Sequence, residues 1–61
     1  MKLKIEIEMD NAAFERNQGP ECARIIRALA DYIEEDYEMT PGVLSVLLDI
    51  NGNRVGEARA I

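Results

Sequence analysis

Residues 2–9 alternate strictly between charged and apolar side chains. Successive side chains of an extended chain point to opposite faces, so a period of two predicts a β-strand with one buried and one solvated face. The lysines and glutamates of the solvated face also suit the edge of a sheet, where charge discourages pairing with another chain. The residues expected to face the core are Leu3, Ile5, Ile7 and Met9.

Apolar side chains then recur at spacings of three and four residues, which predicts one amphipathic helix over about Pro20–Glu35. Pro20 fits the first position of a helix, and Glu21 complements the positive end of the helix dipole. Before the helix, we expect Asp10 to cap a short helical turn that brings Phe14 onto the core. The apolar stripe of the helix consists of Cys22, Ile25, Ile26, Leu29 and Ile33.

The last third of the chain predicts a β-hairpin. Val43–Ile50 alternates as a strand does, and Arg54–Ala60 forms the return strand. Between them, Asn and Gly at positions 51–53 tolerate the positive φ that tight hairpin loops require. We expect this three-residue loop to pair Ile50 with Arg54.

Loop length decides which side of the hairpin is buried. A three-residue loop places Leu44, Val46 and Leu48 on the core face, opposite the small residues at positions 56, 58 and 60. A two-residue loop would instead bring Val46 beside Glu57, so the longer loop is preferred because it keeps charge out of the core. The side chains then expected to project outward are Val43, Leu47 and Val55.

These elements predict an α+β fold in the order β-α-β-β, with one helix packed on one face of a three-stranded mixed sheet. The first two strands are expected to run parallel through a right-handed crossover, with the third strand between them. The 61 residues form one domain, residues 1–61. A core of this size seldom contributes more than about 3–5 kcal/mol, so self-association as a homodimer is an expected supplement.

The net charge of −5 arises in one short segment. The first thirty residues carry equal numbers of acidic and basic side chains, whereas the segment DYIEEDYE at 31–38 has five acids and no base. Such charge opposes the helix dipole and argues against a nucleic-acid partner. It favours a protein partner with a basic surface, and solubility alone is the competing explanation. The acidic patch consists of Asp31, Glu34, Glu35, Asp36 and Glu38.

The sequence lacks the usual catalytic groups. It has no histidine, the side chain best suited to acid–base work near neutral pH. Cys22 lies near a helix N-terminus, but it falls on the apolar stripe and has no base to activate it. The stretch at 49–53 resembles a calcium loop, yet Arg54 and Ala60 stand where that loop needs Gly and Glu. We therefore expect a non-enzymatic protein without cofactor or metal.

A cytoplasmic location without membrane contact is also expected. One cysteine fits a reducing compartment. The N-terminal residues have no continuous apolar region of the kind that marks a signal peptide. No apolar run is long enough to span a membrane.

Three segments of the chain, EMDNAAF, ARIIRALADYIE and LLDINGNRVGEARA, are similar to a group of small uncharacterised proteins encoded in tailed-phage and prophage genomes. The resemblance covers most of the chain and matches least over residues 38–42. It carries no catalytic residues with it. It implies the cytoplasm of a bacterial host and an accessory role, in which small phage proteins often bind a host or defence protein.

The expected function is therefore protein–protein interaction, with inhibition or modulation of a host or defence protein through the acidic patch. Leu47 and Val55 are expected to add an exposed contact surface on the sheet, through which a homodimer would also form. Two alternatives stay open. One is a divalent-metal-binding module, and the other is a structural role as a minor virion component or dimeric scaffold.

Overall fold

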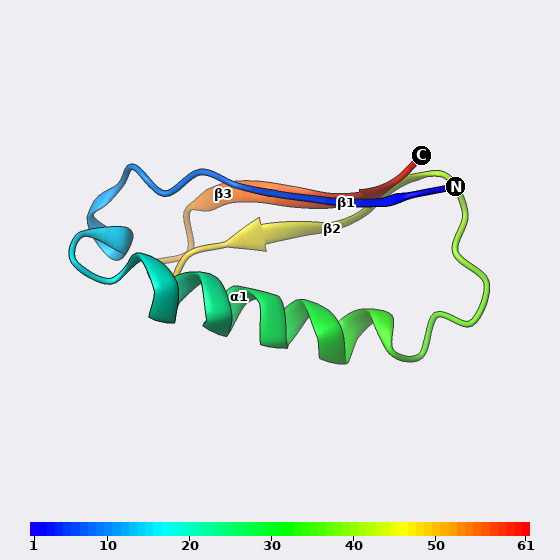
Figure 1. The fold of residues 1–61 in the computed structure, drawn as a ribbon, viewed down its shortest axis with the longest axis horizontal. Helices are drawn as coiled ribbons and strands as arrows, with labels where there is room; N and C mark the ends of the chain where they lie inside the picture. Colours follow the sequence, from blue (N-terminus) through cyan, green and yellow to red (C-terminus); the bar gives the residue numbers. More distant parts are fainter.

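The computed structural model describes residues 1–61 as one antiparallel sheet with a helix across one face (Figure 1). The elements in chain order are β1 (Leu3–Ile7), the 3-10 turn η1 (Ala12–Phe14), α1 (Gln18–Ile33), β2 (Gly42–Leu48) and β3 (Arg54–Ala60). The sheet order β1-β3-β2 confirms the predicted β-α-β-β fold and the central place of the third strand. β1 and β2 run parallel to each other, but β3 lies between them and is antiparallel to both. The sheet is therefore antiparallel at every pair of neighbouring strands, where a mixed sheet is predicted from the sequence.

The helix is shifted slightly from its predicted position. It begins at Gln18 rather than Pro20 and ends at Ile33. Pro20 still lies in the first turn, where the missing N–H leaves no helical hydrogen bond unmade. Asn17 occupies the cap position but makes no side-chain cap bond.

The short turn before the helix forms as expected but with a different cap. The side chain of Asn11, rather than that of Asp10, accepts a hydrogen bond from the backbone N–H of Ala13 at 3.0 Å. The turn brings Phe14 into the core, where its side chain is fully buried. The predicted docking of this aromatic ring is therefore confirmed.

The hydrophobic core lies under α1 and leaves part of β1 uncovered. Its buried members are Phe14, Ile25, Leu29, Leu47, Val55 and Ala58. The helix packs mainly against β2, at the edge of the sheet opposite β1. Leu3 and Ile5 face the same side as the core, yet they are 42% and 40% exposed. The prediction that both are buried is wrong, because the single helix does not reach across to them.

Two bulges alter the predicted register of the hairpin. Leu47, rather than Leu48, pairs with Gly56. The pairing skips Leu44 in β2 and Val55 in β3, so each strand carries one extra residue. The connection between the two strands correspondingly spans residues 49–53 instead of three residues.

Leu47 and Val55 lie in the core, so the prediction that both are exposed is wrong. Their exposed fractions are 4% and 5%, whereas Leu48 is 48% exposed. A slip of one residue turns every following side chain to the other face of a strand. The bulge at Val55 turns that side chain toward the helix, and the changed pairing places Leu47 on the same side.

Gly56 lies close to the backbone of β1. A Cβ atom at this position would collide with the backbone carbonyl of Glu6 on β1. Gly56 is also the register partner of both Ile7 and Leu47. The absent side chain therefore permits close pairing at the centre of the sheet.

Candidate functional site

Glu21 joins the first turn of α1 to the hairpin connection. Its side chain is 3% exposed and accepts hydrogen bonds from Arg24 Nε at 2.8 Å and Arg24 Nη2 at 3.0 Å. Glu21 Oε2 also accepts from the backbone N–H of Ile50 at 2.9 Å. Arg24 Nη2 in turn donates to the carbonyl of Leu48 at 3.2 Å. The position of Glu21 in the first turn predicts only a dipole role, although its spacing of three residues from Arg24 indicates an ion pair.

Asp49 organises the hairpin connection from inside. Its Oδ1 accepts from the backbone N–H groups of Asn51 and Asn53 at 2.8 and 2.9 Å. Its Oδ2 accepts from Asn11 Nδ2 at 2.7 Å and from Asn53 Nδ2 at 3.2 Å. This carboxylate, which resembled a calcium ligand in the sequence, therefore binds the N–H groups of its own loop. The signal that identifies it is an Asp followed by turn residues, because Asp commonly accepts from the backbone two residues on.

Both of these carboxylates are stabilised in the ionised form. The hydrogen bond from Arg24 lowers the pKa of Glu21 most; burial opposes it, and the N–H of Ile50 adds to the lowering. For Asp49, burial acts to raise the pKa, but the hydrogen bonds from three asparagines together outweigh it and lower the pKa. Every buried side-chain nitrogen and oxygen has a hydrogen-bond partner, so the carboxylates of Glu21 and Asp49 are satisfied within the fold.

The five carboxylates of the acidic patch lie at the C-terminal end of α1 and in the loop that follows. All five are exposed, as expected, and none forms an ion pair within the chain. The last turn of the helix has no basic residue to offset them. Tyr32 and Tyr37 lie among these acids and are 64% and 93% exposed. The structure thus keeps the acidic patch together, and it separates this patch from Leu47 and Val55 in the core.

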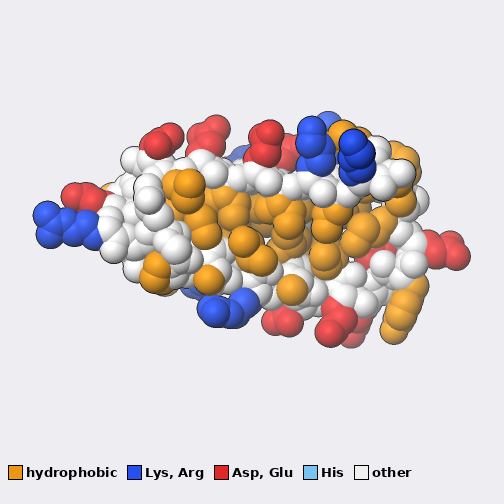
Figure 2. All heavy atoms as spheres, viewed as in Figure 1, with side chains coloured by type: hydrophobic (Ala, Val, Ile, Leu, Met, Phe, Trp, Pro, Cys, Tyr) orange, Lys and Arg blue, Asp and Glu red, His pale blue; other side chains and the backbone are white.

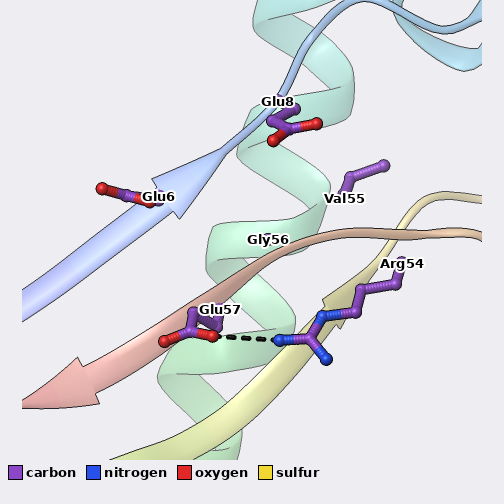
Figure 3. A pocket seen from close by; sticks show the side chains of 6 residues that line it. All are labelled: Glu6, Glu8, Arg54, Val55, Gly56 and Glu57. Carbon is purple, nitrogen blue, oxygen red and sulfur yellow. Dashed lines mark hydrogen bonds and ion pairs between the residues drawn. The ribbon is translucent and has the colours of Figure 1, made fainter.

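The face of the sheet away from the helix is highly charged (Figure 3). A shallow depression there is lined by Glu6, Glu8, Arg54, Val55, Gly56 and Glu57. Glu57 accepts hydrogen bonds from Arg54 at 2.9 Å and from Arg59 at 2.7 Å, and the bond from Arg59 contributes most to lowering the pKa of Glu57. Glu6 and Glu8 form no ion pair. The depression has one apolar lining residue, so it does not suit an apolar ligand.

Apolar side chains form a continuous band between the sheet and the helix on the side where β1 lies (Figure 2). Leu3 and Ile5 of β1 are partly exposed on the core side of the sheet, where their pairing partners Ala60 and Ala58 are buried. The acidic patch and the apolar band are two surfaces that the fold leaves exposed. Neither contains a nucleophile with an adjacent base.

Protein-family models, curated proteins and solved structures were compared with the chain, and none matches it. No three His, Cys, Asp or Glu side chains are grouped so as to hold a metal ion. No helix has the length and apolar character needed to cross a membrane.

Proposed function

We propose that this protein is a non-enzymatic binding protein that acts through its acidic patch on a protein partner with a basic surface. The observation that carries the proposal is a set of five exposed carboxylates without a single basic neighbour in ion-pair range. Complementary charge of this kind directs association and raises its rate. The resemblance to phage-encoded proteins supports a bacterial host or defence protein as the partner.

Two exposed tyrosines strengthen the argument for a protein partner. Tyrosine is enriched in the energetically important parts of interfaces, because its ring buries apolar area while its hydroxyl binds polar groups. Tyr37 is 93% exposed, so almost none of its ring area is used within the chain. A basic partner gains both charge pairing and aromatic contact at this end of α1.

The acids of this patch do not stabilise the helix, so a binding role explains them better than a contribution to stability. The C-terminal end of a helix carries partial negative charge, and acids there cost about 0.3–1 kcal/mol each at most. A basic residue in the last turn would stabilise α1, yet this turn contains none. The patch is therefore retained at some cost to the helix, as expected for a binding surface.

Paired charge reversals test the proposal. The variant Glu34→Lys/Glu35→Lys is expected to lose its bacterial protein partner in affinity capture from host lysate, and the wild-type interaction is expected to weaken as salt rises. The matched control Asp10→Lys/Glu15→Lys makes the same change in net charge at exposed positions outside the patch. Equal capture by all three proteins would contradict the proposal.

A further inference from the structure

β1 is an edge strand with an open hydrogen-bonding side. It pairs with β3 and has no neighbour on its other side. Lys2 exchanges both backbone hydrogen bonds with Ile61, at 2.6 and 2.9 Å, and Glu8 N–H donates to the Val55 carbonyl at 2.7 Å. Because the direction of backbone groups alternates along a strand, the even positions of β1 face β3. The N–H and C=O groups of the odd positions, Leu3, Ile5 and Ile7, therefore face the open edge.

The charged side chains of β1 are poorly matched to their own chain. Across the β1–β3 pairing, Lys4 lies opposite Arg59 and Glu6 lies opposite Glu57. Like charges directly opposite each other destabilise a strand pair. All four charged residues of the segment, at positions 2, 4, 6 and 8, are exposed and form no ion pair. These charges are therefore available to an external partner.

We propose that this partner is a second copy of the chain, paired antiparallel along β1 about a two-fold axis at Ile5. The segment KLKIEIE, residues 2–8, has opposite charges at equal distances on either side of Ile5. The two-fold places Lys4 opposite Glu6 of the second copy and Lys2 opposite Glu8 of the second copy. The charged side chains of β1, which discourage pairing with other strands, thus complement those of a second copy.

Backbone direction and charge together select this register. In an antiparallel pair, two opposite residues either both direct their N–H and C=O groups toward the other strand or both direct them away. An odd position of β1 must therefore lie opposite an odd position of the second copy, and an even position opposite an even one. The two-fold axis then passes through a residue and not between two residues. An axis at Lys4 opposes two copies of Lys4, and an axis at Glu6 opposes two copies of Glu6. The axis at Ile5 gives opposite charge at every cross-copy position of the segment.

The apolar band fits the same arrangement. Opposite side chains lie on the same face, so Ile5 meets Ile5 of the second copy, and Leu3 meets Ile7 of the second copy, on the helix side of the sheet. Leu3 and Ile5 are the β1 side chains that α1 leaves partly exposed. Pairing joins the two sheets into one of six strands, with the two apolar bands adjacent at its centre. This inference does not depend on the proposed function, since the acidic patch takes no part in it.

Complementary single variants test the inference by analytical ultracentrifugation. Wild type is expected to form a dimer of twice the 6.9 kDa chain mass in low salt. Lys4→Glu and Glu6→Lys each create two like-charge contacts across the interface, so each is expected to weaken the dimer by about tenfold or more. Each change also replaces a like-charge pair within the chain by an opposite one, against Arg59 or Glu57, so lost association does not reflect unfolding.

Mixing the two variants supplies the decisive comparison. Lys4→Glu on one chain faces Glu6→Lys on the other, and every remaining pair is again complementary, so the mixture is expected to form a heterodimer. The double variant Lys4→Glu/Glu6→Lys restores complementarity within one chain and is expected to dimerise as wild type does. A monomeric wild type at millimolar concentration in low salt would overturn the inference. A dimer dissociation constant that is the same for wild type and all of these variants would also overturn it.

Discussion

At the scale of residues, the most informative positions are two carboxylates whose burial the pattern of apolar and polar residues does not predict. Glu21 and Asp49 are buried at 3% and 4% exposure, and both connect the hairpin to the preceding chain. Periodicity detects apolar side chains, so it assigns buried acids to solvent. One partner of each is distant in sequence, the backbone N–H of Ile50 for Glu21 and the side chain of Asn11 for Asp49, and becomes a neighbour only after the chain has folded. Local spacing to Arg24 and to Asn51 supplied the only signals.

The lowered pKa values of Glu21 and Asp49 predict a loss of stability in acid. A carboxyl group with a lower pKa in the folded chain stabilises it fully above the unfolded pKa, near 4, and this stabilisation disappears as pH falls through the folded value. Urea unfolding followed by circular dichroism, in steps from pH 7 to below pH 3, measures the slope. The variant Glu21→Gln is expected to be less stable at pH 7 and to lose less stability in acid. Glu15→Gln, at an exposed position without an ion pair, is the control and retains the wild-type slope.

Substitution of Gly56 tests the close approach of β1 and β3. Gly56→Ala places a Cβ against the Glu6 carbonyl, so the free energy of unfolding is expected to fall by about 1–3 kcal/mol. Gly19→Ala is the matched control, because a Cβ at Gly19 meets nothing within 4 Å. Thermal unfolding at a fixed protein concentration compares the two. Equal stability of both variants would show that the strands have room at Gly56.

At the scale of elements, the sequence predicts the order and number of elements but not the hairpin register. Strict alternation identifies β1, and spacing of three and four identifies α1, because each pattern extends over several turns or residues. The bulges at Leu44 and Val55 each add one residue, and a period-two pattern cannot reveal where such an addition occurs. For this reason the sequence pattern wrongly predicts that Leu47 and Val55 are exposed. The acidic patch was predictable, because exposed charge at a helix end depends little on register.

The register itself predicts contrasting effects at adjacent positions of β2. Leu47→Ala removes a core side chain and is expected to lower the free energy of unfolding by about 2–5 kcal/mol. Leu48→Ala changes a side chain that is 48% exposed, so its effect is expected to stay within about 1 kcal/mol. Chemical denaturation of the two variants measures the difference. A larger effect at Leu48 than at Leu47 would favour the register without bulges and contradict the bulged hairpin.

At the scale of the whole molecule, the two proposed contacts use separate surfaces. The acidic patch lies at the end of α1 and carries the proposed contact with a basic partner. The apolar band and the charged edge of β1 carry the proposed contact with a second copy. A six-stranded sheet would enlarge the apolar core that 61 residues provide, and it would present two acidic patches on one particle. Two linked sites bind a multivalent partner more tightly than either site alone.

Isotope-filtered NMR on a mixture of labelled and unlabelled protein directly measures the proposed pairing of β1 with its own copy. We expect contacts between Leu3 of one copy and Ile7 of the other, and between the two copies of Ile5. Contacts between copies at Val43 and Val46 of β2, or no contacts between copies at millimolar protein concentration in low salt, would contradict it.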